Sequence, residues 1–149
     1  MRRGPARTMP SMKTKIFVDT SAFVALYNKN DQHHAAAAQY LGGLDHSAVA
    51  LHTTNYIFDE TLTRIRSQDG FQAARRFAEG FRRSTLFVYH YVDRDTETQA
   101  LSIFEKFADK LLSFTDCTSF AVMRAHKIAQ AFTFDDDFSK VGFEIANPL

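Results

Sequence analysis

Short apolar runs alternate with segments of helical periodicity along most of this chain. Runs of apolar, β-branched and aromatic residues predict strands, at 16–18, 49–51, 86–89 and 130–134, with a last candidate at 143–145. Apolar residues at helical spacing predict helices, directly after the first run and at 34–41, 55–67, 71–83, 96–108 and 115–125. This alternation indicates an α/β domain with a mainly parallel sheet.

Two of the predicted helices have an apolar stripe that we expect to face the core. In the segment 71–83 the stripe consists of Phe71, Ala74, Phe77, Ala78 and Phe81. In the segment 96–108 it consists of Ala100, Leu101, Phe104 and Phe107. The chain contains 15 Phe and no Trp. We therefore expect phenylalanine to build the core rather than to stack on a ligand.

The length of 149 residues is typical of one domain. We expect residues 15–149 to form this domain and residues 1–14, which are rich in Arg and contain two Pro, to be a flexible leader. Translation could start at either Met1 or Met12. No apolar stretch approaches the roughly 20 residues of a membrane-spanning helix, so we expect no membrane association.

Charge and cysteine content exclude several classes of protein. The formal net charge of +1 excludes a uniformly basic nucleic-acid binder, although it allows a local basic patch. The single cysteine, Cys117, excludes a disulfide or a cysteine-based zinc cage within one chain. It also suits the reducing cytoplasm, and we expect it to be a small buried residue.

Acidic residues follow the predicted strands. Asp19 and Asp135 come directly after apolar runs, and Asp116 opens a predicted helix with Thr115 as part of its cap. Because ligands bind at the carboxyl ends of parallel strands, these acids are expected at one edge of the sheet. Each has a simpler interpretation when taken alone. Asp19 and Asp116 could each be a helix cap. Residues 135–137 could form a solvated turn, and Glu60 could be a surface residue on its helix.

Four segments in order resemble the PIN-domain nuclease family, in particular the VapC-type ribonuclease toxins of toxin–antitoxin modules. They are 18–22 (VDTSA), 58–62 (FDETL), 114–119 (FTDCTS) and 133–138 (TFDDDF). The resemblance implies a three-layer α/β/α sandwich and a site for Mg²⁺ or Mn²⁺, with catalytic and metal-binding acids at Asp19, Glu60, Asp116 and Asp135. Thr20 and Ser21 would shape the first turn, and Asp136 or Asp137 would assist or replace Asp135. Only one of Asp59 and Glu60 can face such a site, because neighbouring helical residues point about 100° apart.

Electrostatics supports a cation independently of the family, provided that the acids converge. Two carboxylates about 5 Å apart repel by about 3 kcal/mol at an effective dielectric constant near 20. A helix N-terminus offsets only about 0.3–1 kcal/mol per acid. A cluster of four acids therefore needs a divalent cation or protonation, and oxygen ligands favour Mg²⁺ or Mn²⁺ over zinc.

The predicted function is metal-assisted hydrolysis of RNA phosphodiester bonds. The resemblance further implies a cognate antitoxin and a homodimer that forms through the region 55–83. Transfer, ribosomal and messenger RNA all stay open as targets. The main alternative is a catalytically silent PIN-like module that binds RNA or protein. A haloacid-dehalogenase-type phosphatase is disfavoured because Ser21 occupies the position of its second acid, and the order of the acids fits a receiver domain poorly.

Basic residues on the predicted helices are candidates for contact with RNA phosphates. We single out Arg64, Arg75, Arg76 and Arg124, with Arg66, Arg82, Arg83, His126 and Lys127 as further members of the group. Two adjacent histidines, His33 and His34, lie on a polar stretch far from the acidic motifs in sequence. We expect both to be surface residues without a role in the chemistry.

Overall fold

The computed structural model describes residue 4 and residues 12–148 of the chain. Its centre is one five-stranded sheet in the order β3-β2-β1-β4-β5, in which every pair of neighbours is parallel. The strands are β1 Thr14–Val18, β2 Val49–Thr54, β3 Phe87–His90, β4 Gln130–Phe132 and β5 Glu144–Ile145. The mainly parallel sheet predicted from the sequence is confirmed.

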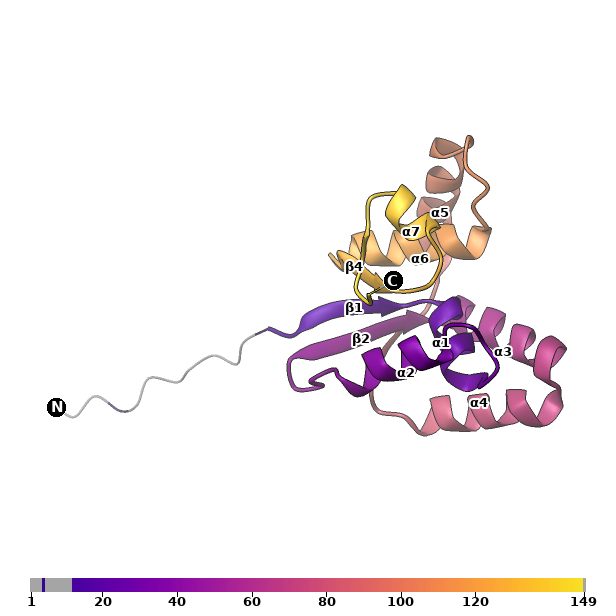
Figure 1. Ribbon diagram of the computed structural model, residues 1–149. Helices are drawn as coiled ribbons and strands as arrows, with labels where there is room; N and C mark the ends of the chain where they lie inside the picture. The colour runs from indigo at the N-terminus through magenta and orange to yellow at the C-terminus, as the bar shows by residue number, and fades with distance from the viewer. Residues whose placement is uncertain (1–3, 5–11, 149) are drawn as a thin grey trace.

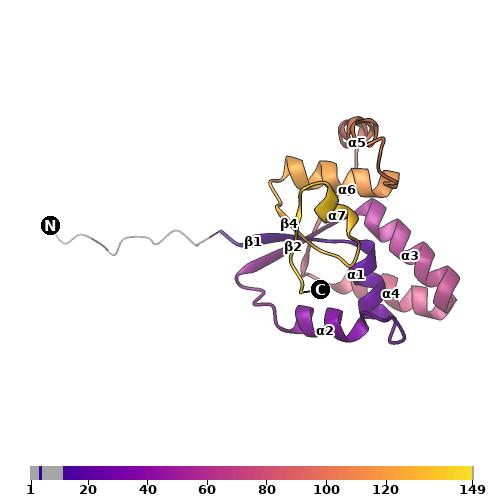
Figure 2. The same ribbon diagram turned by 45° about the horizontal axis from the view of Figure 1, so that its top comes forward.

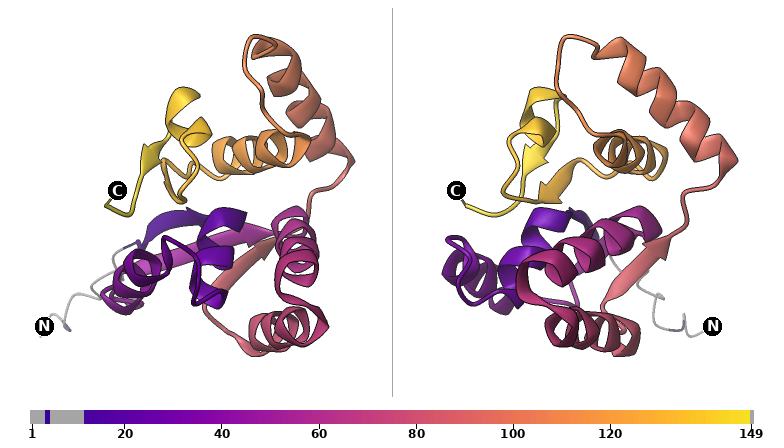
Figure 3. Two further views of the ribbon diagram at one scale, coloured as in Figure 1. Left: turned by 45° about the vertical axis from the view of Figure 1, so that its right-hand side comes forward. Right: turned by 90° about the vertical axis from the view of Figure 1, so that its right-hand side faces the viewer.

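Helices cover both faces of this sheet, which makes three layers (Figure 1). The helices are α1 Thr20–Tyr27, α2 His34–Gly42, α3 Asn55–Asp69, α4 Phe71–Arg83, α5 Arg94–Lys106, α6 Phe114–Ala125 and α7 Asp137–Lys140. In Figure 2, α1, α2 and α4 lie below the sheet and α5, α6 and α7 lie above it. Helix α3 contacts α1 and α4 as well as α6, so it joins the two helical layers at one end of the sheet (Figure 3).

Phenylalanine fills the core on both sides of the sheet. Above it, the rings of Phe120 and Phe138 meet edge to face with their centroids 5.0 Å apart. Below it, Phe23 and Phe77 meet in the same way at 5.8 Å. These four side chains are at most 2% exposed. The prediction of a core built on phenylalanine is confirmed for them.

Three apolar residues predicted to face the core are instead exposed. Phe71 is 58% exposed because it is the first residue of α4, and the buried face of this helix begins at Ala74. On α5, Ala100 and Ile103 are buried, while Leu101 and Phe104 are 51% and 49% exposed. Within the described part of the chain, α5 packs extensively on α6 alone, so it buries a narrower stripe than its periodicity predicted.

Several boundaries also differ from the predictions. Strand β1 begins at Thr14, inside the predicted leader, and the rest of that leader lies almost entirely outside the described residues. Helix α5 begins at Arg94 because Asp93 caps it by accepting a hydrogen bond from the Thr96 amide (2.9 Å). Strand β4 ends at Phe132, two residues early, which leaves Thr133 and Phe134 in a loop. Within the described residues, no helix combines the length and apolarity needed to cross a membrane.

Candidate active site

Asp19 joins the carboxyl end of β1 to the start of α1. Its side chain is the N-cap of α1 and is only 5% exposed. One carboxylate oxygen, Oδ2, accepts hydrogen bonds from the hydroxyls of Ser21 (2.9 Å) and Thr133 (2.8 Å). The predicted role of Ser21 in shaping the first turn has a physical basis here, because both hydroxyls fix the rotamer of a buried acid.

Thr133 connects Asp19 to the loop after β4. With their protons donated to Asp19, the two hydroxyl oxygens accept hydrogen bonds from loop amides. Thr133 Oγ1 accepts from the Asp135 amide (3.0 Å), and Ser21 Oγ accepts from the Phe134 amide (2.9 Å). This role of Thr133 is not predicted by the sequence, in which the only signal is its position two residues before Asp135.

Asp116 approaches this loop from α6. The sequence predicted Thr115 and Asp116 as a helix cap. Asp116 is the third residue of that helix and takes part in its capping box, but the N-cap lies before both residues. Ser113 is the N-cap, and the two residues form a capping box in which the Asp116 amide donates to Ser113 Oγ (3.0 Å) and the Ser113 amide donates to Asp116 Oδ2 (3.2 Å). This reciprocal pair holds the Asp116 carboxylate at the end of the helix that faces the loop.

Three carboxylates meet at this point. Oxygen atoms of Asp116, Asp135 and Asp137 all lie within 4.8 Å of one another. The Asp137 amide donates to Asp135 Oδ1 (2.9 Å), which fixes the shape of the loop. Lys140 pairs with both Asp136 and Asp137 at 3.3 Å, but the Asp136 side chain is 75% exposed, whereas that of Asp137 is 20% exposed. Of the two residues considered as assistants to Asp135, the geometry therefore selects Asp137.

Glu60 completes the acidic group from α3. A hydrogen bond from Thr115 and the nearby Asp19 both influence its pKa, which places it beside the starts of α1 and α6. Its neighbour Asp59 is exposed. The alternative left open by the sequence is thus settled in favour of Glu60 as the residue that faces the other acids. The four predicted acids lie together, contributed by four separate segments.

The pKa values of all four acids are raised. Burial is the largest cause in every case, and repulsion by Asp19 adds to it for the other three. For Asp116 the two effects, with Asp135 as a further repulsive neighbour, raise the pKa to about 7. A cluster of this kind binds either protons or a cation tightly, because each added positive charge relieves several repulsions at once.

The hydroxyl of Thr20 adds a further oxygen next to Asp19. Its Oγ1 is buried, and it lies close enough to the Glu60 carboxyl to lower the Glu60 pKa by hydrogen bonding. This hydroxyl therefore adds an oxygen atom to the acidic group, between the start of α1 and Glu60.

The candidate RNA-contact residues are spread over the surface. Arg64 lies close enough to Glu60 to lower its pKa. Arg75 is paired with Glu79 at 2.9 Å, and Arg76 lines a separate hollow of about 430 Å³ with Tyr27 and Lys29. Arg124 is exposed in the last turn of α6, at the opposite end of that helix from Asp116. Only Arg64 is therefore placed next to the acids.

His33 lies much closer to the acidic loop than the sequence predicted. Its imidazole stacks on the ring of Phe134, with the centroids 4.4 Å apart and the planes 6° from parallel. The stack joins the segment before α2 to the residue directly before Asp135. His34 instead contacts the Ala25 carbonyl oxygen through Nδ1 (2.7 Å). Cys117 is fully buried, as expected, and burial raises the pKa of its thiol.

Comparison with known proteins identifies the family. The family model described as PIN domain matches residues 16–144. The chain belongs to the PIN-domain family. A protein of Mycobacterium tuberculosis named 23S rRNA-specific endonuclease VapC20 is 37% identical to it over 133 residues, which are 89% of this chain and 98% of that relative. A VapC ribonuclease of Archaeoglobus fulgidus is 32% identical over 124 residues, which are 82% of this chain and 78% of the relative.

Solved structures agree with this PIN-domain assignment. The crystal structure of M. tuberculosis VapC20, described as a Sarcin-Ricin loop cleaving toxin, matches with a TM-score of 0.83 and covers 89% of this chain and 99% of that one. VapBC2 from Rickettsia felis shares the fold with a TM-score of 0.66 at 11% identity, over 89% of this chain and 96% of that one. The chain is thus a PIN-domain ribonuclease of the VapC toxin class, and the activity predicted from the sequence is confirmed at this level.

Proposed function

We propose that Asp19, Glu60, Asp116 and Asp135 bind Mg²⁺ or Mn²⁺ and form the catalytic site of this ribonuclease, with Asp137 and Thr20 in support. The observation that carries the proposal is the convergence of carboxylates: oxygen atoms of Asp116, Asp135 and Asp137 lie within 4.8 Å of one another, next to the buried Asp19. The donors at this site are carboxylate and hydroxyl oxygens, the ligand set that Mg²⁺ and Mn²⁺ prefer.

When bound, such a cation activates water and stabilises the charge that develops on the phosphate. The residues of the chain supply position and charge. Ser21 and Thr133 hold the Asp19 carboxylate in one rotamer, and the capping box does the same for Asp116. Among the described residues near the acids, neither the Ser21 and Thr133 hydroxyls nor the Cys117 thiol is suited to act as a nucleophile. Both hydroxyls already donate to Asp19, and the Cys117 thiol is buried with a raised pKa. We infer direct attack by water on the phosphodiester bond.

The similarity to VapC20 supports ribosomal RNA, and specifically 23S rRNA, as the first target to test among the three RNA classes. As a toxin of the VapC class, the protein would act on RNA in the cytoplasm and would be inhibited by a cognate antitoxin. We also propose a homodimer, which light scattering of the purified protein would reveal as twice the chain mass of 16.9 kDa.

The decisive experiment combines cleavage with metal binding. Purified protein is incubated with 23S rRNA, transfer RNA and messenger RNA in Mg²⁺, in Mn²⁺ and in excess EDTA, and Mn²⁺ binding is measured separately by calorimetry. Asp116→Asn should lose at least about 100-fold in cleavage rate and should bind Mn²⁺ much more weakly. Asp95→Asn, at an exposed position in the first turn of α5, serves as the matched control and should behave as the wild type.

Two outcomes would contradict the proposal. Cleavage at an undiminished rate in EDTA would exclude the cation. RNA binding without cleavage by the wild type, unchanged in Asp116→Asn, would instead favour the catalytically silent binding module. The buried acidic cluster argues against that alternative, because a binding module gains nothing from repulsion between its own carboxylates.

A further inference from the structure

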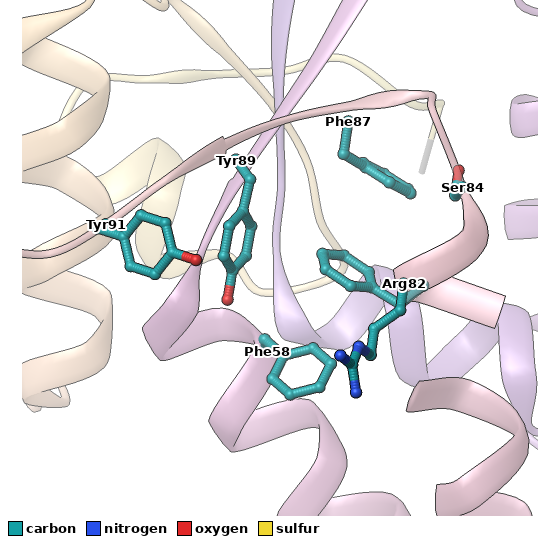
Figure 4. A pocket seen from close by; sticks show the side chains of 7 residues that line it. Phe58, Arg82, Ser84, Phe87, Tyr89 and Tyr91 are labelled. Carbon is teal, nitrogen blue, oxygen red and sulfur yellow. The ribbon is translucent and has the colours of Figure 1, made fainter. Parts of the chain in front are cut away.

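A second concave surface lies under the edge strand β3, between α3 and the end of α4. Figure 4 shows the side chains around this cavity of about 450 Å³. They are Phe58, Phe81, Arg82, Ser84, Phe87, Tyr89 and Tyr91, which we call the aromatic pocket. Its volume lies within the range of about 300–1,000 Å³ that is usual for small-molecule sites.

Aromatic rings form most of its wall. Phe58 and Phe81 lie with centroids 5.2 Å apart, and Phe81 meets Tyr89 at 5.5 Å. Tyr91 contacts Tyr89 edge to face at 5.0 Å and is 72% exposed. An exposed ring beside an open, ring-lined cavity offers a free π-face. Nucleic-acid bases stack on such faces without regard to sequence.

The lining of the pocket contains one positive charge and no negative charge, which favours binding of an anion. Arg82 is exposed and lies beside the Phe58 ring in Figure 4, and none of the seven lining residues is acidic. Helix α4 carries four Arg and one Glu, and that Glu is already paired with Arg75. Two copies of this surface would repel each other, so its charge favours a phosphate-bearing partner, and the proposed homodimer would form through other parts of the region 55–83.

The position of the pocket links it to the acids. Phe58 packs on Phe77 and Phe81 of α4, whereas Glu60, two residues later on the same helix, faces Asp19 and Thr115. The two sites therefore lie on opposite sides of α3. Helix α3, about 10–12 Å in diameter, lies between them, so an RNA strand that reaches both sites passes around this helix.

We propose that the aromatic pocket binds one unstacked nucleobase of the RNA substrate, a few nucleotides from the bond that is cut, with Arg82 on an adjoining phosphate. This inference rests on the proposed ribonuclease function and adds a subsite to it. RNA-binding proteins commonly recognise single-stranded loops through bases that are splayed out and stacked on aromatic or Arg side chains. The pocket offers both kinds of partner to one nucleotide.

The test measures binding separately from cleavage. Fluorescein-labelled single-stranded RNA of ten nucleotides, which the wild type cuts at one site, is titrated into Asp116→Asn and followed by anisotropy. In that background, Tyr91→Ala and Arg82→Ala should each weaken binding by about fivefold or more. Phe71→Ala and Arg83→Ala change an exposed ring and an exposed Arg outside the pocket, so they should leave the affinity within about twofold.

Abasic substitution locates the base itself. Each nucleotide of the same RNA is replaced in turn by an abasic residue. The affinity of each RNA is then measured for Asp116→Asn and for the double variant that also carries Tyr91→Ala. One abasic position should weaken binding when Tyr91 is present and have no further effect in Tyr91→Ala. Equal losses in the two proteins at every position would overturn the proposal.

The remaining outcomes separate the two sites. One outcome is unchanged RNA affinity in both pocket variants, together with normal cleavage when the same substitutions are made in a protein that retains Asp116. This outcome would reject the pocket as an RNA-binding site and leave the ribonuclease function intact. Unchanged RNA affinity combined with a loss of dimer mass in light scattering would assign the pocket to a protein interface and also reject the proposal. If the wild type neither binds nor cuts any RNA tested, the proposed function itself fails.

Discussion

The imidazole of His33 lies flat on the ring of Phe134, with a centroid distance of 4.4 Å and an interplanar angle of 6°. Phe134 directly precedes Asp135, and its amide is also held by Ser21 Oγ (2.9 Å). The segment 133–137, which carries the carboxylates of Asp135 and Asp137, is therefore held by two contacts on different sides. The Ser21 hydroxyl, in the first turn of α1, accepts a hydrogen bond from its backbone, and the His33 ring from the segment before α2 covers the Phe134 side chain.

This contact predicts an aromatic requirement at position 33. His33→Ala should lower cleavage and weaken Mn²⁺ binding by roughly two- to tenfold, the range expected for the loss of an aromatic pair. His33→Phe should retain both, because it keeps the stack and removes only the titratable nitrogens. Cleavage assays and calorimetry on the two variants check this, with His46→Ala in an exposed loop as the control. A His33→Phe protein as weak as His33→Ala would show that an imidazole nitrogen, not the stack, is needed.

Thr133 is the second residue whose substitution should affect the site through its neighbours. Thr133→Val keeps the shape of the side chain but removes the donor to Asp19 and the acceptor for the Asp135 amide. Because Thr133 is fully buried, the groups left unpaired should cost about 1–3 kcal/mol in the free energy of unfolding. Urea denaturation measures this cost, and cleavage should fall with it.

Thr133→Ser is the matched control for that experiment. It retains the hydroxyl and loses one methyl group, so it should recover most of the cleavage rate. Recovery of stability without recovery of cleavage would mean that the methyl group, and not the hydrogen-bond network, positions the acids.

The position of the acids at one sheet edge could be predicted because it depends on local signals. Asp19 and Asp135 follow strand-like runs, and parallel strands bring their carboxyl ends to the same edge whatever the details of packing. The choice between Asp59 and Glu60 was already limited to one residue by helical geometry. Asp116 was placed there as the start of a helix after a short apolar segment, and the family resemblance then added Glu60, whose neighbours in sequence predict only a helix.

The contacts that could not be predicted join segments far apart in the sequence. Nothing local pairs His33 with Phe134 or Thr133 with Asp19, since both contacts depend on how loops meet after the sheet has formed. The rotation of α5, which buries Ile103 and exposes Phe104, is likewise set by its packing on α6. The aromatic pocket was missed for the same reason, because periodicity marks Phe81 as apolar but cannot show that its surroundings stay open.

The acidic triplet provides a third prediction. Asp137→Asn should weaken Mn²⁺ binding by about tenfold, because its carboxylate lies within 4.8 Å of those of Asp116 and Asp135. Asp136→Asn should have almost no effect, since that side chain is 75% exposed and does not belong to the group of converging carboxylates. Calorimetry on the two variants compares adjacent residues of the same type. Equal losses in both would mean that Asp136 turns inward when the cation binds.

The raised pKa of Asp116 predicts how stability depends on pH in the absence of metal. A folded-state pKa of about 7, well above the value of 3.8 for the unconstrained carboxyl, means that the folded protein holds a proton that the unfolded chain releases. Between these pH values the folded state binds more protons, so the Asp116 contribution to stability falls as pH rises and levels off above pH 7.

Thermal unfolding in EDTA should therefore show that the wild type loses stability relative to Asp116→Asn from pH 5 to pH 8. Using this difference cancels the opposite trend from His52 and His90, whose pKa values burial lowers. Mn²⁺ added at pH 8 should restore the wild type and have little effect on the variant. Parallel stability curves for the two proteins would show that Asp116 is ionised across this range without metal, and that the carboxylates repel far less than their burial implies.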